Sequence, residues 1–243
     1  MEAYTVFRDT IEGLDEVFYT DIEPPMVILV RGPPGSMKST FVHMMISKYL
    51  ATRPNEFALY TSYEETVRSQ LKMIKRLGID ISLNLQISDL SDIRKLKGDQ
   101  DTKVNYLDFT EKLLNHYKKR HGENFSLFAL DSLGALYSLI LSAETSQDVR
   151  RRMYHFFEVL RDLNLTAFII MESTLEGESK LLGDEGFLSD GIIMVGLRRK
   201  QGRLIRYLQV EKMRATHHSM EQHAMEIQGN NLIVMGPIFE ELG

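Results

Sequence analysis

Four short apolar runs recur along the first two thirds of the chain. Their sequences are MVILV at residues 26–30, FALYTS at 57–62, SLFAL at 126–130 and TAFIIM at 166–171. Runs of this length without alternating polar positions are typical of strands that are buried on both faces of a parallel sheet. We therefore predict four buried strands at these positions.

Segments with helical periodicity separate these runs. Residues 40–50 follow the first run, and Val67, Leu71 and Ile74 follow the second at steps of four and three. Such spacing places apolar side chains on one face of a helix. It recurs ahead of the third run and again in residues 149–163. The alternation of strand and helix predicts right-handed βαβ crossovers and a mostly parallel central sheet flanked by helices.

The pattern changes after about residue 190, where short extended runs alternate with turn signals. These signals are Gly202 and Gly229-Asn230-Asn231, which favour tight hairpin connections. We predict antiparallel hairpins at the C-terminal end of an α/β fold. No linker, low-complexity tract or internal repeat divides the chain, so residues 1–243 are expected to form one domain.

The composition is that of a folded domain, and it narrows the chemistry. Of the residues, 43% are hydrophobic and 26% are charged, with 29 Lys and Arg against 34 Asp and Glu, a net charge of −5. This balance argues against a general polyanion-binding surface. The lack of cysteine excludes disulfides, thiolate nucleophiles and Cys-ligated metal sites. Without an HExxH helix or a cysteine partner, three histidines are expected at an interface or on the surface, namely His217, His218 and His223.

Neither export nor membrane insertion is expected. The N-terminal segment has acidic residues early and lacks the basic, then apolar, then small-residue order of a secretory signal. The longest apolar runs are much shorter than the roughly 20 residues that span a bilayer. We therefore expect a cytoplasmic protein.

A glycine-rich motif directly follows the first predicted strand and precedes a predicted helix. Its sequence, GPPGSMKST, nearly matches the P-loop pattern G-x-x-x-x-G-K-[ST]. In such a loop, backbone N–H groups surround a phosphate, the lysine reaches the β- and γ-phosphates, and the hydroxyl binds Mg²⁺. Lys38 and Ser39 have the last two roles. The predicted ATP-binding residues are Gly32, Pro33, Pro34, Gly35, Ser36, Met37, Lys38, Ser39 and Thr40.

Met37 stands where the P-loop pattern has glycine. If the loop needs a positive φ there, a non-glycine residue costs on the order of 1–3 kcal/mol. The loop then either bends differently or binds nucleotide less well, which affects the expected turnover more than the expected fold. The alternative interpretation of the whole motif is an ordinary Pro-Gly turn between a strand and a helix.

A second acidic residue for the metal is expected at the end of a buried strand. Asp131 ends the third apolar run and would lie at the carboxyl edge of the sheet, where ligands bind in open parallel sheets. A lone aspartate at such a place is alternatively a helix cap. Beside a P-loop we favour a Mg²⁺ site formed by Ser39 and Asp131.

Several further segments resemble the KaiC-like branch of the RecA-type P-loop ATPases. They are GLDE at residues 13–16, YEE at 63–65, LDS at 130–132, Glu172 after AFIIM, SDGII at 189–193 and KMRATHH at 212–218. The resemblance spans nearly the whole chain. The last segment is its most specific part, because KaiC-like proteins typically have K-M-R-G-T-x-H there. Ala215 replaces that glycine, so the sequence resembles a divergent single-domain paralogue with a RecA-like fold.

The resemblance implies catalytic roles for two adjacent glutamates. Glu64 would be the general base that orients the attacking water, and Glu65 would support it, because hydrolysis needs a carboxylate near the γ-phosphate. Glu65 has an alternative interpretation. Ser62 and Glu65 have the spacing of a capping box for the helix that follows.

The resemblance also implies three residues that contact the nucleotide. Glu172 would sense it from the end of a strand, although a buried cap is the alternative. Lys212 and Arg214 would reach the γ-phosphate of a neighbouring subunit, and alternation along a strand places both on one face. Their alternative is an exposed cationic face of an edge hairpin. A site shared between subunits implies a ring-shaped homo-oligomer, often a hexamer.

The favoured function is that of an ATP-binding, slowly hydrolysing KaiC-like protein whose nucleotide state controls assembly or the binding of an unidentified protein partner. One alternative is a switch or scaffold that holds ATP and scarcely turns it over, which Met37 favours. Another is a RecA-type recombination accessory, but DNA binding is disfavoured because residues 173–186 have four acids against Lys180, a net charge of −3. Some relatives phosphorylate themselves, and autokinase activity is left open because no adjacent Ser-Thr pair stands out as an acceptor.

Overall fold

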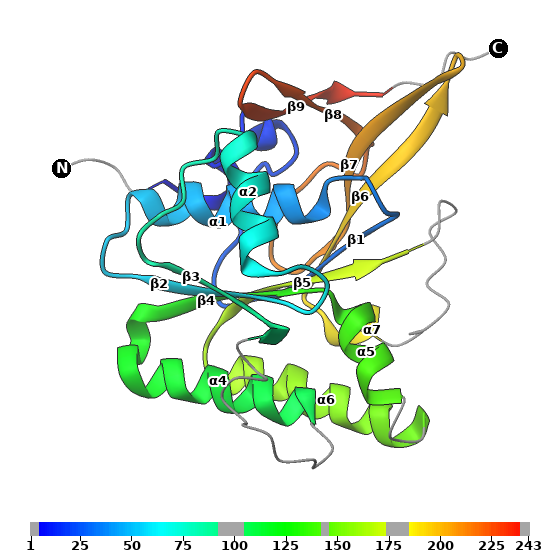
Figure 1. Cartoon of the computed structure of the whole chain (residues 1–243). Helices are drawn as coiled ribbons and strands as arrows, with labels where there is room; N and C mark the ends of the chain where they lie inside the picture. The colour runs from blue at the N-terminus through cyan, green and yellow to red at the C-terminus, as the bar shows by residue number, and fades with distance from the viewer. Residues whose placement is uncertain (1–4, 92–104, 142–145, 174–184, 239–243) are drawn as a thin grey trace.

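The computed structural model describes residues 5–91, 105–141, 146–173 and 185–238, and the strands in these ranges form one nine-stranded sheet (Figure 1). Neighbouring strands are parallel from β3 to β6 in the spatial order and antiparallel from β6 to β9. The predicted parallel sheet with C-terminal hairpins is therefore confirmed. In spatial order the strands are β3 (Leu85–Asp89), β2 (Phe57–Ser62), β4 (Phe125–Asp131), β5 (Thr166–Glu172), β1 (Val27–Gly32), β6 (Gly191–Lys200), β7 (Arg203–Met213), β8 (His223–Gln228) and β9 (Asn231–Pro237).

Helices cover both faces of the sheet (Figure 1). One face has α1 (Lys38–Ala51) and α2 (Val67–Arg76), and the other has α4 (Tyr106–His121), α5 (Leu133–Leu141) and α6 (Ser146–Asp162). Each face has its own hydrophobic core. None of the helices in the described ranges combines the length and apolar character needed to cross a bilayer. The short elements are η1 (Phe7–Asp9), η2 (Leu14–Glu16), η3 (Gly122–Asn124) and α7 (Glu185–Leu188).

Side chains alternate between the two cores along β1. Ile28 and Val30 belong to the core around α1, whereas Val27 and Leu29 belong to the core on the opposite face. A strand that is covered on both faces leaves no position for polar residues, which explains the continuous apolar run. The four predicted strands are confirmed, with ends shifted by at most two residues.

Helix α2 faces the sheet differently from the prediction. The apolar spacing predicts Leu71 on the inward face, but Leu71 is 41% exposed and the polar Gln70 is 2% exposed. Residues three and four apart share a face of a helix, so Val67, Gln70 and Ile74 form the inward side. Because a polar residue occupies an inward position, apolar spacing alone gives the wrong rotation of this helix.

Strand β3 is absent from the predicted elements. Its sequence, LQISD, is short, and three of its five residues are polar. It is the edge strand beside β2. Its last residue, Asp89, accepts a hydrogen bond at Oδ2 from the Val67 N–H at 2.6 Å. β3 thereby fixes the first residue of α2.

The C-terminal hairpins extend the same sheet, because β6 pairs in parallel with β1 and antiparallel with β7. Gln201 and Gly202 connect β6 to β7 with φ angles of 48° and 75°, as the twist of a tight hairpin turn requires. At the other end of β6, Asp190 Oδ2 accepts a hydrogen bond from the Val27 N–H at 3.0 Å. This bond ties the beginning of β6 to the beginning of β1.

The prediction that the C-terminal histidines lie at an interface or on the surface is wrong for His223, which is 2% exposed within the single chain. Its Nε2 lies 2.9 Å from Ser219 Oγ, and its Nδ1 lies 3.3 Å from the carbonyl oxygen of Met235. Both ring nitrogens therefore have partners, which is what allows the ring to be buried. Within the described ranges, no group of three or more His, Cys, Asp or Glu residues could hold a metal ion.

Candidate functional site

The predicted P-loop connects the end of β1 to Lys38, the first residue of α1. β1 lies between β5 and β6, so the loop emerges at the carboxyl edge of the parallel strands, where ligands bind. Gly35 has a φ of 78°, a conformation that glycine adopts at no steric cost. A Cβ atom at Gly32 would lie 1.9 Å from the backbone oxygen of Val195. The loop therefore needs its first glycine for close packing against β6.

Met37 adopts the backbone conformation that glycine adopts without strain. Its φ is 82° and its ψ is 27°, and it is the N-cap residue of α1. The half-buried Met37 side chain packs against the core around α1, which offsets part of the cost of a left-handed backbone. The loop thus has a left-handed residue at this position although glycine is missing.

Lys38, the first residue of α1, is buried, with 7% of its surface exposed. Its Nζ donates a hydrogen bond to the carbonyl oxygen of Pro33 at 3.0 Å. Burial lowers the pKa of Lys38, and the carboxylates of Glu172, Asp131 and Glu64 oppose this change. The chain therefore brings three of its predicted acidic site residues close to the predicted phosphate-binding lysine.

Asp131 ends β4, which is separated from β1 by β5. Its Oδ2 accepts a hydrogen bond from the Tyr60 hydroxyl at 2.6 Å. Burial raises the pKa of Asp131, and the hydroxyls of Tyr60 and Ser39 oppose the rise. The alternative role of helix cap belongs to the next residue, since Ser132 Oγ accepts a hydrogen bond from the Ala135 N–H at 3.2 Å. Asp131 is thus left to face the P-loop.

Sequence reasoning missed Tyr60, which looks like one more apolar residue of a buried strand. Its ring stacks on the His43 ring of α1, with centroids 3.8 Å apart and planes at 14°. Both residues are fully buried, and burial lowers the pKa of His43 to about 4, so this imidazole is neutral at neutral pH. A buried tyrosine hydroxyl usually needs a partner. From the sequence alone, this requirement of Tyr60 could have indicated that a polar group lies near the end of β2.

Glu64 and Glu65 lie on the turn between β2 and α2, and both are exposed. The Glu64 carboxylate accepts a hydrogen bond from the Ser132 hydroxyl, which holds it beside Asp131. Glu65 instead accepts a hydrogen bond from Ser69 Oγ at 2.9 Å and so leans along α2. The two glutamates therefore differ in direction although they are adjacent in sequence.

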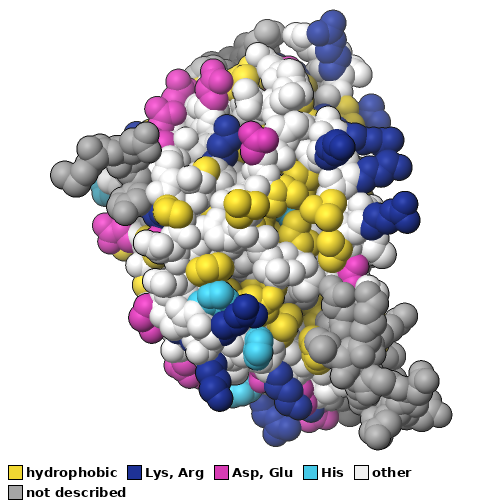
Figure 2. Space-filling model, turned by 60° about the vertical axis from the view of Figure 1, so that its left-hand side comes forward, with side chains coloured by type: hydrophobic (Ala, Val, Ile, Leu, Met, Phe, Trp, Pro, Cys, Tyr) yellow, Lys and Arg dark blue, Asp and Glu magenta, His cyan; other side chains and the backbone are white. Residues whose placement is uncertain are grey.

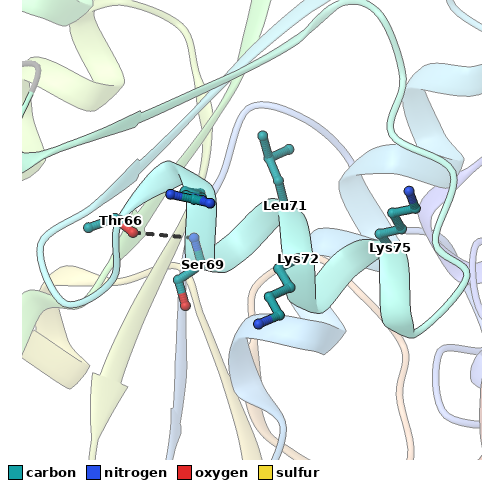
Figure 3. Close-up of a pocket in the computed structure, with 6 residues that line it drawn as sticks. Thr66, Ser69, Leu71, Lys72 and Lys75 are labelled. Atoms are coloured by element: carbon teal, nitrogen blue, oxygen red, sulfur yellow. Dashed lines mark hydrogen bonds between the residues drawn. The ribbon is translucent and has the colours of Figure 1, made fainter.

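The predicted capping box of α2 is wrong. The N-cap residue is Thr66, whose Oγ1 accepts a hydrogen bond from the Ser69 N–H at 3.2 Å (Figure 3). Ser62 Oγ accepts hydrogen bonds from the N–H groups of Glu64 and Glu65 at 3.3 and 3.0 Å. Ser62 therefore shapes the turn that presents both glutamates, and α2 begins after that turn.

Glu172 ends β5 and is exposed, so the alternative of a buried cap is wrong. Because β5 lies between β1 and β4, Glu172 lies between the ends of those two strands. The side chains surround a hollow of about 380 Å³, and Gly32, Pro33 and Ser36 are buried outside its lining. The predicted site residues that line the hollow are Pro34, Gly35, Met37, Lys38, Ser39, Thr40, Glu64, Glu65, Asp131 and Glu172.

Lys212 and Arg214 do not join this hollow. The Lys212 Nζ donates hydrogen bonds to the carbonyl oxygens of Gly186 and Ser189 at 2.8 and 2.6 Å. The Arg214 Nη1 donates to Asp190 Oδ1 at 2.9 Å. Asp190 adjoins the beginning of β1, whereas the P-loop follows its end. Within one chain, these two cations therefore lie at the opposite edge of the sheet from the P-loop.

Residues 7–239 match the family model described as the KaiC ATPase. The chain belongs to the KaiC ATPase family. It is 26% identical over 238 residues to a UPF0273 protein of Aeropyrum pernix, covering 92% of this chain and 91% of that one. It is 25% identical over 235 residues to the circadian clock protein KaiC3 of Synechocystis, covering 94% of this chain and 45% of KaiC3.

Two further comparisons concern a repair protein and a solved structure. The DNA repair protein RadA of Aquifex aeolicus is 32% identical over 168 residues, which is 68% of this chain and 32% of RadA. The crystal structure of a KaiC-like protein from Pyrococcus horikoshii has a TM-score of 0.76 at 22% identity, covering 96% of this chain and all of that one. The fold is thus the one that KaiC-like proteins share.

The residues of this KaiC-family site fit Mg²⁺, the metal that usually accompanies a P-loop nucleotide. Mg²⁺ prefers oxygen ligands and is commonly held by one or two protein groups together with phosphates. The Ser39 hydroxyl and the Asp131 carboxylate supply such oxygens close together, as the influence of Ser39 on the Asp131 pKa indicates. The Tyr60 hydroxyl donates a hydrogen bond to Oδ2 of Asp131 and so orients this carboxylate.

Proposed function

We propose that this KaiC-family chain binds ATP with Mg²⁺ and hydrolyses it slowly, with part of the site supplied by a neighbouring copy. The observation that carries the proposal is the convergence of Lys38 with the carboxylates of Glu172, Asp131 and Glu64. Phosphates need a cation and a metal-binding acid, and hydrolysis needs one further carboxylate that is not used by the metal. Glu64 meets this last requirement because its partner is Ser132.

The chain's own groups have separate tasks in this proposal. The backbone N–H groups of Gly35, Ser36 and Met37 and the ammonium group of Lys38 bind the phosphate oxygens, because Pro33 and Pro34 have no N–H to donate. Glu64, held by Ser132, orients a water molecule and accepts its proton as the water attacks the γ-phosphate in line, while the bond from the γ-phosphorus to the departing ADP breaks. Ser39 and Asp131 would hold Mg²⁺, which would neutralise part of the phosphate charge.

Glu172 is the proposed sensor of the nucleotide. Its carboxylate attracts Lys38 when no phosphate competes, and a bound phosphate would take over that attraction. Lys212 and Arg214 are proposed to act on the nucleotide of the next copy, because their bonds to residues near the beginning of β1 keep them from their own P-loop. An assembly is then needed for full activity.

Two alternatives have specific support. A switch that holds ATP without hydrolysing it is favoured by Met37, whose left-handed backbone stores strain next to the phosphates. A DNA-binding role is favoured by the likeness to RadA. The net negative charge that argues against DNA binding belongs to residues 173–186, which lie largely outside the described residues. A binding assay with DNA at several salt concentrations must decide.

The test is ATP hydrolysis per subunit, measured across a wide range of protein concentrations. Lys38→Ala provides the blank, and Glu64→Gln separates binding from turnover. Specific activity that rises and then saturates with concentration supports a shared site. If activity equals that of the blank while ATP still binds, the hypothesis of an ATPase is wrong and that of an ATP-holding switch is favoured. Activity that is constant with concentration while the protein dissociates contradicts the trans role of Lys212 and Arg214.

A further inference from the structure

The outer face of α2 combines cations with one exposed apolar side chain. Arg68, Leu71, Lys72 and Lys75 follow one another at steps of three, one and three, which places them on one side of the helix. All four are exposed, and they border a shallow hollow of about 630 Å³. Figure 3 shows Leu71, Lys72 and Lys75 extending away from the helix. This basic face thus includes the leucine that the apolar spacing had predicted to be buried.

The cations of the basic face have no partner in the described part of the chain. No ion pair with a described residue involves Arg68, Lys72, Lys75 or the exposed Arg76. Four positive charges within ten helical residues, none of them paired with a described acid, stand out in a chain whose net charge is −5. Figure 2 shows Lys and Arg side chains in two areas, one at the upper right beside hydrophobic side chains and one along the lower edge of the view.

A second surface has the opposite character. Residues 9–23 contain six acidic residues and no Lys, Arg or His, and we call this stretch the acidic segment. Its carboxylates at Glu12, Asp15, Glu16 and Glu23 are exposed and form no ion pair with a described residue. Like the basic face, it presents one exposed apolar ring, because Tyr19 is 57% exposed.

Both surfaces are held by ordered backbone. Glu12 forms a β-bridge with Ile233, and the Tyr19 N–H donates a hydrogen bond to the carbonyl oxygen of His217 at 2.9 Å. The basic face belongs to a regular helix with a satisfied N-cap at Thr66. Surfaces that are already ordered lose little conformational entropy when they bind.

We propose that the basic face of one copy docks on the acidic segment of a second copy. The three cations of the basic face, together with the neighbouring Arg76, then meet four carboxylates, and Leu71 and Tyr19 supply apolar contact between the two surfaces. The partner is a second copy because the complementary charges belong to the same chain and do not pair within it. Each copy has one surface of each kind, so every contact joins two unlike surfaces, and all copies are satisfied once the assembly closes.

The consequence for the nucleotide site rests on the proposed function. α2 begins two residues after Glu65, and its first turn includes Ser69, whose hydroxyl bonds the Glu65 carboxylate. A neighbour docked on the basic face lies beside the turn that presents both glutamates. Docking therefore brings the neighbour close to the nucleotide and can change the position of the glutamates there.

Exchange of charges between the two surfaces tests the interface. Association of the full-length chain is measured by sedimentation at low and high ionic strength, with and without ATP and Mg²⁺. We expect Lys72→Glu with Lys75→Glu, and separately Glu12→Lys with Glu16→Lys, to raise the dissociation constant at least about tenfold at low salt. The fourfold variant, in which opposite charges face each other again, should recover association.

The matched control is Lys119→Glu with Arg120→Glu, two exposed cations at the end of α4. This control makes the same charge change elsewhere and should associate like the unchanged chain. The proposal is overturned if the control weakens association equally or if the fourfold variant fails to recover it. It is also overturned if the wild-type chain remains monomeric and binds only an oligonucleotide through α2. ATP hydrolysis by a chain that never associates removes this interface but keeps the ATPase. Recovery by charge exchange without ATP turnover keeps the interface and removes the ATPase.

Discussion

Two regions of this chain place a cation among acidic groups, and they differ in what binds the cation. At the P-loop, Lys38 has a hydrogen bond to the Pro33 carbonyl oxygen and forms no ion pair with a described residue. Near the beginning of β6, Arg214 pairs with Asp190 at 2.9 Å, and Arg161 approaches the same carboxylate at 3.5 Å. The first cation is held by a neutral carbonyl, whereas the second is already neutralised.

The difference indicates which part of the proposed ATPase site is ready for a ligand. At the P-loop a phosphate replaces a single carbonyl contact of Lys38. Arg214 must instead give up its ion pair with Asp190 before it can contact a phosphate of the next copy, and Lys212 must give up two carbonyl contacts. Because these contacts must first be broken, we expect Lys212 and Arg214 to contribute less to hydrolysis than Lys38 does, and only when copies assemble.

The largest predicted effect concerns the ready site. Lys38→Ala should abolish detectable ATP hydrolysis, a loss of about 100-fold or more, because the positive charge next to the phosphates is removed. ATP affinity should fall as well. Hydrolysis assays and titration with a fluorescent ATP analogue measure the two effects. Lys48→Ala, an exposed lysine on the same helix, is the control and should leave both unchanged.

The next prediction separates the two glutamates. Glu64→Gln should lower the turnover rate about 100-fold while ATP still binds, since a neutral amide keeps the shape but cannot accept the proton. Glu65→Gln should lower it by only a few-fold, because the Glu65 carboxylate bonds Ser69 and leans along α2. Single-turnover kinetics on both variants give the comparison. Equal losses would show that the direction of the side chains does not decide the role.

The third prediction concerns Arg214, which is already paired with Asp190 near the beginning of β6. We expect about a tenfold loss of activity at protein concentrations where the chain assembles, and no loss where it is monomeric. Arg161→Ala is the control, because it removes a cation from the same carboxylate, Asp190, without a proposed role at the phosphate. If both variants lose activity equally, Arg214 acts only by holding Asp190 in place.

Tyr60→Phe is a milder change at the P-loop site. Its hydroxyl opposes the rise of the Asp131 pKa that burial causes, so its removal should raise this pKa further. The carboxylate is then protonated at a higher pH, and the acidic limb of the activity profile moves to higher pH. Tyr63→Phe is the control, since its hydroxyl bonds Thr110 instead. An unchanged limb in Tyr60→Phe would mean that Asp131 does not limit activity at acidic pH.

The two regions also differ in how far the sequence predicts them. The P-loop and Asp131 are local to strand ends, so spacing and buried apolar runs are enough to place them. The partners of Lys212 and Arg214 depend on the pairing of β6 with β1 and β7, which no local pattern encodes. The contact of Tyr60 with Asp131 and the exposure of the Leu71 side chain were missed for a related reason. Apolar spacing does not distinguish a buried polar residue such as Gln70 from an exposed one.

The smallest predicted effects concern the two positions where a glycine expected from the P-loop or KaiC pattern is replaced. Met37 and Ala215 both have a positive φ, 82° and 52°, which costs a residue with a Cβ roughly 1–2 kcal/mol. Ala215→Gly should therefore raise the free energy of unfolding by about 0.5–1 kcal/mol, after the greater freedom of glycine in the unfolded chain is subtracted. Met37→Gly should gain less or lose stability.

The reason for this difference is that the Met37 side chain packs against the core around α1, whereas Ala215 is exposed. Urea denaturation of both variants and of the unchanged chain gives the two free energies. Equal stabilisation by both substitutions would mean that packing of Met37 contributes nothing and that its strain is uncompensated. In that case Met37→Gly should also increase ATP turnover, because the relaxed P-loop would no longer resist the conformation that holds the phosphates.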